Sequence, residues 1–137
     1  DFNPSYIESA RQRTGREFIV ADVTKYEVAP DERFDLILAN SLFHHIDDAS
    51  TRRILAHLAT LLSPDGHVHI FDLVLPSRPS VSRFLARADR GDFPRPIDEW
   101  RELFTDAFEP VVFEPYPLGA GGITLWNMIY FKGRARR

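Results

Sequence analysis

The sequence contains no cysteine among its 137 residues. Without thiols the chain has no disulfide framework, no thiolate nucleophile and no cysteine-based zinc site. The lack of cysteine is compatible with a reducing compartment, and we expect a cytoplasmic protein.

Long apolar runs and a strong charge of either sign are also missing. No apolar segment approaches the ~20 residues of a membrane helix, and no secretory signal is visible after Asp1. The net charge of -3 gives no general electrostatic reason to bind nucleic acid or an anionic membrane. We therefore expect no nucleic acid and no membrane as a partner.

The residues that are present suit one globular domain. Apolar residues make up 44% and charged residues 27% of the chain, which is ordinary for a folded protein. A chain of this length holds a single core. Residues 1–137 are thus expected to form one domain.

Helix and strand periodicities alternate along the first half of the sequence. The continuous apolar run over 34–39 is typical of a parallel strand covered on both faces. The expected elements are a helix over 4–14 capped by Asn3 and ended by Gly15, buried strands over 18–21 and 34–39, a helix over 48–62, a turn over 63–66 and a strand over 68–73. Strand, helix and strand over 34–73 predict a right-handed βαβ unit.

The second half predicts two helices followed by two strands. Ser80 is expected to cap a helix that runs through Arg90 and ends at Gly91. A helix over 97–107 carries Trp100, Leu103 and Phe104 on one face, and strands over 111–113 and 124–131 are joined through glycines. The fold class is α/β, with an antiparallel pair of strands at the C-terminus.

Four segments, taken together, carry a family resemblance. They are Asp1-Phe-Asn-Pro-Ser-Tyr-Ile-Glu-Ser-Ala-Arg11, Phe18-Ile-Val-Ala-Asp22, Phe34-Asp-Leu-Ile-Leu-Ala-Asn-Ser-Leu-Phe-His-His-Ile-Asp-Asp48 and Leu61-Leu-Ser-Pro-Asp-Gly66. In this order and spacing they resemble class I S-adenosylmethionine-dependent methyltransferases over residues 1–76. Asp65 departs from the family pattern, which commonly has glycine there.

The resemblance implies a Rossmann-like sheet ordered 3-2-1-4-5-7-6, with helices on both faces. Aligned in this way, the chain starts at the last residue of strand 2, so we expect it to lack strand 1, its glycine-rich cofactor loop and most of strand 2. Residues 1–76 would form the cofactor-side half and 77–137 the substrate-side helices and strands. The expected activity is methyl transfer to a small-molecule acceptor by the parent protein, with this chain an inactive or impaired fragment.

The resemblance also implies a cofactor site for S-adenosylmethionine, or for its product S-adenosylhomocysteine. Its ribose would be held by a carboxylate, its adenine by an aromatic ring and an acid, and its methionine end by polar groups after the fourth strand. The corresponding residues are Asp1 for the ribose, Phe2, Asp22 and Val23 for the adenine, and Asn40 and Ser41 for the methionine end.

His44 and His45 are the catalytic candidates. A histidine is suited to take the proton from an oxygen or nitrogen acceptor, although a histidine after a strand also often bonds only to the backbone. No metal is expected, because adjacent histidines on an extended loop point in different directions. Phe84, Phe93, Trp100 and Phe104 are candidates for an apolar acceptor pocket, with a plain core stripe as the alternative for the last two.

An exposed strand edge follows from the family's sheet order, because strands 1 and 2 separate strand 3 from strand 4. We expect one of three situations: further protein outside this chain, a collapse of residues 18–21 onto the strand over 34–39, or a homodimer that covers the edge. The alternative function is a non-catalytic methyltransferase-like module for binding or assembly. A nicotinamide-dependent oxidoreductase is disfavoured, since the sequence has no Tyr-x-x-x-Lys pair.

Overall fold

The computed structural model of the chain describes residues 2–23 and 25–136. Asp1, the residue expected to bind the ribose, lies outside the described residues. The chain divides into two compact units, residues 1–32 and 33–137, and each unit is considered by itself.

The first unit is built around one helix, α1 (Pro4–Thr14). The Asn3 side chain accepts hydrogen bonds from the backbone N–H groups of Ser5 and Tyr6, and Gly15 ends the helix with a left-handed φ of 65°. A cap that accepts the first free N–H groups and a glycine that tolerates positive φ are the expected helix boundaries. The predicted bounds of this helix are confirmed.

The predicted buried strand over 18–21 is wrong. These residues form no strand, and Ile19 and Val20 are 58% and 43% exposed. The Phe18 carbonyl accepts a hydrogen bond from Arg11 Nε at 3.1 Å in place of a strand partner. A β-strand is stable only when a neighbouring strand pairs with its backbone, so apolar composition alone was insufficient.

The second unit begins with the predicted βαβ unit. Strand β1 (Phe34–Asn40) leads through the short 3₁₀ helix η1 (Phe43–His45) into α2 (Asp48–Leu61), and β2 (Leu62–Leu73) follows. Strands β1 and β2 are parallel. The apolar stripe of α2 is confirmed, since Ile54, Leu55 and Leu61 are buried.

The predicted turn over 63–66 is instead part of β2. Phe34 pairs with Leu62 and Leu36 pairs with His67, so the partner strand holds extra residues between these two pairs. The turn-forming residues are therefore accommodated as a bulge. A Cβ added to Gly66 would lie 2.6 Å from the Phe34 carbonyl oxygen, which shows how closely the two backbones approach.

The C-terminal pair of strands forms a long antiparallel hairpin, β3 (Phe108–Ala120) and β4 (Ile123–Ala135). Both strands are longer than predicted, because the glycines fill only the tight connection. Gly121 and Gly122 have φ of 59° and 78°. Positive φ at both central positions is the requirement of a two-residue hairpin loop that matches strand twist.

The four strands are ordered β1-β2-β4-β3. This is the order that the last four strands of the family's sheet would have, so the predicted Rossmann-like α/β class is confirmed. Strand β1 lies at the edge of the sheet, where Leu36 and Leu38 are each 60% exposed, so the prediction of a strand covered on both faces is wrong for these residues. Residues 18–21 form no strand, so their predicted pairing with this edge is wrong. A homodimer in which a second copy of the chain covers the edge stays a prediction.

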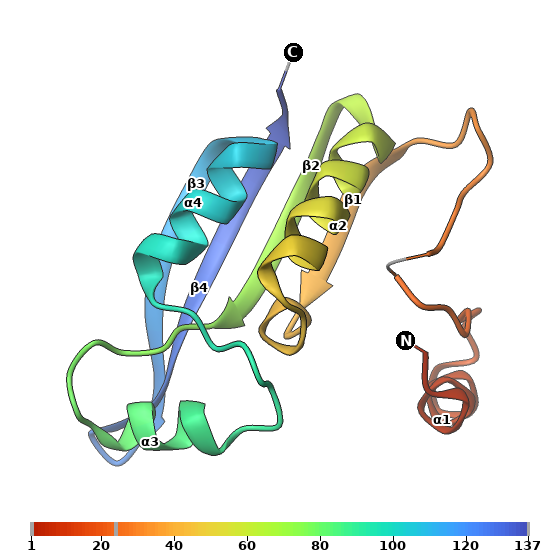
Figure 1. Cartoon of the computed structure of the whole chain (residues 1–137). Helices are drawn as coiled ribbons and strands as arrows, with labels where there is room; N and C mark the ends of the chain where they lie inside the picture. The colour runs from red at the N-terminus through yellow and green to blue at the C-terminus, as the bar shows by residue number, and fades with distance from the viewer. Residues whose placement is uncertain (1, 24, 137) are drawn as a thin grey trace. The chain divides into compact units, whose positions relative to one another are not determined.

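Helices α2 and α4 (Ile97–Ala107) lie along one face of the sheet, and the core of this unit is beneath them (Figure 1). The Trp100 and Phe104 rings stack with centroids 5.3 Å apart, and Phe104 stacks on Phe131 of β4 at 4.8 Å. The alternative interpretation of Trp100 and Phe104 as a core stripe is therefore confirmed.

Helix α3 (Val81–Ala88) begins at the predicted cap, Ser80, whose hydroxyl accepts a hydrogen bond from the Arg83 N–H. It ends at Ala88, two residues before the predicted Arg90, because the C-cap residue Asp89 has an extended backbone that stops the helix. No helix among residues 2–23 and 25–136 is both long enough and apolar enough to cross a membrane.

Candidate functional site

The centre of the site is a buried pair of side chains, His44 and Asp72. His44 lies in η1, directly after β1, and Asp72 is near the end of the neighbouring strand β2. His44 Nδ1 is 2.6 Å from Asp72 Oδ1, and the exposed fractions of the two residues are 5% and 0%. Parallel strands bring their carboxyl ends to one edge of a sheet, where α/β proteins bind ligands.

The Asp72 carboxylate also organises the backbone around it. Its Oδ2 accepts the Phe43 N–H at 2.8 Å, and its Oδ1 accepts the Leu73 N–H at 2.8 Å. A buried carboxylate is tolerated only when such donors replace its lost hydration. Asp72 therefore fixes both the ring of His44 and the start of the turn that carries it.

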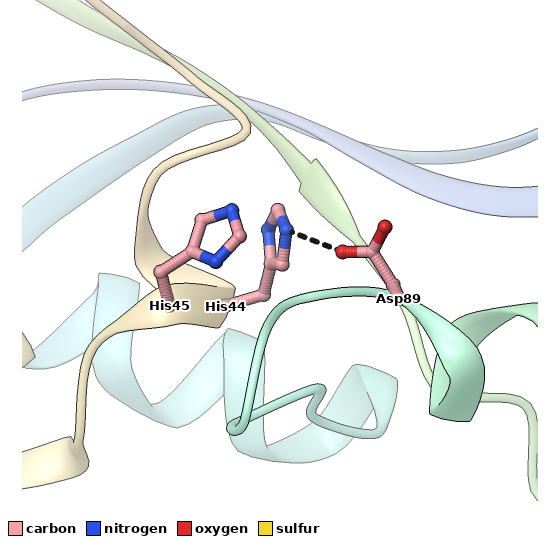
Figure 2. Close-up of side chains that lie close together, drawn as sticks. All are labelled: His44, His45 and Asp89. Carbon is pink, nitrogen blue, oxygen red and sulfur yellow. Dashed lines mark ion pairs between the residues drawn. The ribbon is translucent and has the colours of Figure 1, made fainter.

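Asp89 lies on the other side of the His44 ring, with its Oδ2 3.1 Å from His44 Nε2 (Figure 2). Burial alone would lower the pKa of His44, but the hydrogen bonds and negative charges of Asp72 and Asp89 outweigh it, so the pKa is raised. Both ring nitrogens thus face carboxylates, an arrangement that favours the imidazolium.

His45 is exposed, and its ring lies beside that of His44 with the centroids 4.0 Å apart. The tight 3₁₀ turn of η1 keeps the rings together, so the expectation that these side chains point in different directions is wrong. Within the described part of the chain, no hydrogen bond occupies a ring nitrogen of His45, which leaves this ring available to a ligand.

Arg95 stabilises the turn that carries the two histidines by hydrogen bonds to its backbone. It is 3% exposed, and its guanidinium donates to the carbonyls of Phe43 at 2.8 Å and Ile46 at 2.6 Å, the residues that flank the histidine pair. Its Nε donates to Asp48 Oδ1 at 2.7 Å. The planar fork of arginine is suited to several simultaneous acceptors, and here it fixes the backbone on both sides of the two histidines.

A cavity of about 370 Å³ adjoins the histidine pair. Its polar side contains Ser41, His44, His45, Asp89 and Arg90, and its apolar side contains Leu73, Leu118, Trp126 and Met128. Cavities of roughly 300–1,000 Å³ with few polar groups are typical of small-molecule sites. The predicted apolar pocket is not at Phe84 or Phe93, which are 71% and 40% exposed; the hairpin β3–β4 provides the apolar wall instead.

Ser41 borders this cavity with a strained backbone. Its φ of 52° makes it the only non-glycine residue with positive φ among those the structure describes, and its N–H donates to the Phe71 carbonyl at 2.8 Å. Such a conformation costs about 1–3 kcal/mol in a residue with a side chain. The sharp turn that it makes sends the chain from β1 into η1.

We expect Ser41→Gly to raise the free energy of unfolding by about 1 kcal/mol, because glycine adopts positive φ without steric cost. Ser41→Ala keeps the strain and is the matched control, so it should give no gain. Urea unfolding of both variants measures the difference. An equal response of the two variants would show that the hydroxyl, and not the backbone, sets the energy at this position.

The other residues predicted to bind the cofactor are distributed over both units. Asn40 is the exposed last residue of β1, outside the cavity lining. In the first unit, Val23 borders a separate cavity of about 540 Å³, whereas Phe2 is 77% exposed and Asp22 makes an ion pair with Lys25 at 3.7 Å. Among the described residues, the structure thus brings Ser41, His44 and His45 together in one cavity.

Three residues of the site, Asp72, Asp89 and Arg95, had no role assigned from the sequence, although Asp72 lies at the carboxyl end of a predicted strand. Asp72 had a visible signal, a charged residue inside an otherwise apolar strand. No periodicity marks Asp89 or Arg95 as buried or paired. The partners that they contact in the site are far away in the sequence. Asp89 is 45 residues from His44, and Arg95 is 52 residues from Phe43.

A family model described as a methyltransferase domain matches residues 1–66. Residues 1–66 are thus similar in sequence to a methyltransferase domain. Malonyl-[acyl-carrier protein] O-methyltransferase 1 of Ilyobacter polytropus is 36% identical over 72 residues, which are 50% of this chain and 25% of that protein. The chain therefore spans a quarter of the length of this curated relative.

Solved methyltransferase structures share the fold of the whole chain. N-methyltransferase NodS from Bradyrhizobium japonicum, in complex with S-adenosylhomocysteine, has a TM-score of 0.75 at 18% identity, covering 100% of this chain and 65% of that one. A methyltransferase from Methanosarcina mazei has a TM-score of 0.79 at 16% identity, covering 100% and 81%. The predicted resemblance to class I methyltransferases is confirmed by the family match and by this shared fold.

Proposed function

We propose that the protein to which this methyltransferase domain belongs transfers a methyl group from S-adenosylmethionine to a small-molecule acceptor. The observation that carries the proposal is the cavity beside His44 and His45, at the carboxyl ends of β1 and β2. The methyltransferase-domain match over 1–66 and the likeness to NodS, solved with S-adenosylhomocysteine, support the choice of cofactor.

The residues present are compatible with part of a cofactor site. Val23 borders an open cavity in the first unit, and the Ser41 turn follows β1 at the sheet edge where ligands bind in this class of fold. S-adenosylmethionine would supply an electrophilic methyl group. The residues of this chain are left with two tasks, to orient the acceptor and to remove its proton.

His45 is the residue best placed to remove that proton. Its exposed ring borders the cavity, whereas both ring nitrogens of His44 face carboxylates. The cofactor would supply the methyl group to an acceptor oxygen or nitrogen and would keep the electron pair of the broken carbon–sulfur bond. The acceptor proton passes to His45, and His44, held by Asp72, positions the turn that presents it.

The experiment measures binding and transfer separately. We expect S-adenosylhomocysteine to bind the protein to which this domain belongs by calorimetric titration, and its His45→Ala variant to bind equally while losing about 10²–10⁴-fold in methyl transfer to a panel of phenols and amines. His67→Gln, on the same sheet but outside the cavity lining, is the control and should keep full transfer.

Three outcomes are distinguishable. Failure of the protein to which this domain belongs to bind S-adenosylhomocysteine would contradict the proposed cofactor. Binding without transfer to any acceptor would favour the alternative of a non-catalytic binding module, or an impaired fragment. Equal transfer by the wild-type chain and His45→Ala would remove His45 from the chemistry and leave the fold-level proposal in place.

A further inference from the structure

The histidine pair and Asp89 together form a set of metal donors. One nitrogen of His44, one nitrogen of His45 and one carboxylate oxygen of Asp89 all lie within 4.8 Å of one another. Figure 2 shows the His44 ring between the His45 ring and the Asp89 carboxylate, with the carboxylate directed at a ring nitrogen of His44. Two of the three come from consecutive residues of η1, and the third comes from the residue that ends α3.

The distances are close to those that a bound ion would need. Zinc binds histidine nitrogen and carboxylate oxygen at about 2.0–2.2 Å, so two tetrahedral ligands lie about 3.4 Å apart. His44 Nε2 and Asp89 Oδ2 are already 3.1 Å apart. The 4.8 Å limit for the three donors exceeds the tetrahedral spacing by about 1.4 Å, and the exposed ring of His45 has the freedom to move closer.

Asp72 provides the outer support that metal-binding histidines require. It contacts His44 through Nδ1 at 2.6 Å, which leaves Nε2 as the nitrogen directed at Asp89. A histidine that donates one N–H to a carboxylate and presents its other nitrogen to the ion is the common arrangement in metal sites. Because Asp72 is fully buried and makes two further hydrogen bonds, this orientation is fixed before any ion arrives.

We propose that His44, His45 and Asp89 bind a divalent ion of the zinc class. Two imidazoles and one carboxylate suit zinc and similar ions better than magnesium or calcium, which prefer oxygen ligands. The proton on His44 Nε2 leaves to solvent when the ion binds, as metal ligands must be deprotonated. The cavity lies on the open side, so a fourth position remains for water or a small molecule.

This inference goes beyond the proposed function and does not depend on it. An ion at this site occupies one ring nitrogen of His45 and places a positive charge beside the other, which lowers the basicity of the ring. Metal binding therefore opposes proton removal by His45, and an ion of this class is expected to inhibit the proposed methyl transfer.

The test uses Co²⁺ as a spectroscopic substitute for zinc, added to the 137-residue chain without cofactor or acceptor. We expect one Co²⁺ per chain, visible d–d absorption bands of a low-coordinate site, and displacement of those bands by an equivalent of Zn²⁺. His45→Ala and Asp89→Asn should each weaken binding at least tenfold, and Asp72→Asn, which acts through His44, about 10–100-fold.

His67→Gln is the matched control, because it removes a histidine from the same unit without touching the three donors. It should leave the affinity unchanged. Far-ultraviolet circular dichroism of each variant separates loss of a ligand from loss of fold, and His45→Ala replaces an exposed side chain that the core does not need.

The proposal is overturned if the wild-type chain shows no d–d bands, or if His45→Ala and Asp89→Asn bind Co²⁺ as tightly as the wild-type chain does. Because the readout involves no methyl transfer, its failure leaves the proposed function standing.

Discussion

Asp72→Asn is expected to lower the free energy of unfolding by about 3–5 kcal/mol, the usual result of removing one partner from a buried charge pair. The Asp72 carboxylate is fully buried and accepts hydrogen bonds from the Phe43 and Leu73 N–H groups while it contacts the ring of His44. Asparagine has nearly the same shape, but it replaces one acceptor oxygen by an N–H₂ group. At least one of the three donors then faces another donor inside the core.

Asp89→Asn is the matched comparison, because it alters the other carboxylate on the same imidazole. The Asp89 side chain is 32% exposed, so water replaces part of what it loses, and we expect a change below about 1 kcal/mol. Urea unfolding of the two variants measures both values on one scale. Equal losses would mean that the depth of burial does not set the strength of this pairing.

The elements that the sequence predicted well are those whose signals are local. The cap at Asn3 and the stop at Gly15 bound α1 as expected, and the stripe of Trp100, Leu103 and Phe104 gave α4 its predicted residues. Helix boundaries depend on side chains within three or four residues of one another, so their information is present in a short stretch of sequence.

The strand over 18–21 and the turn over 63–66 were wrong because strand formation depends on distant partners. The apolar residues of 18–21 resemble a strand, yet the segment pairs with no other strand. Ser63-Pro-Asp-Gly66 resembles a turn, yet it forms a bulge in β2 beside β1. In both cases the backbone hydrogen bonds, and not the local composition, determined the outcome.

The site shows the same division. The resemblance to class I methyltransferases indicated Ser41, and the proton chemistry of histidine indicated His44 and His45. Neither gave the state of the two rings, which depends on Asp72 and Asp89, carboxylates 28 and 45 residues further along the chain. Nor does any local pattern mark the positive φ of Ser41, since glycine is the usual residue in that conformation.

Arg95→Met is the second large effect that we expect, a loss of about 3–5 kcal/mol in the free energy of unfolding. Methionine keeps the length of the side chain and its packing near Trp100, over which the guanidinium now lies at 4.8 Å from the ring centroid. It donates no hydrogen bonds, so the Phe43 and Ile46 carbonyls lose a buried donor. Each such orphaned acceptor costs about 1–3 kcal/mol.

Arg52→Met provides the contrast that isolates burial from charge. Arg52 also makes two ion pairs, with Glu102 and Asp106, but its side chain is 42% exposed, so its removal should cost less than about 1 kcal/mol. Urea unfolding compares the two variants.

Arg95→Lys separates charge from shape. An ammonium retains the charge, but it lacks the planar set of N–H groups with which the guanidinium donates to the carbonyls on both sides of the histidine pair. We expect its stability to fall between those of the wild-type chain and Arg95→Met. A full recovery of stability by lysine would show that Arg95 acts through its charge on Asp48 alone, and that the histidine turn holds its shape without the guanidinium.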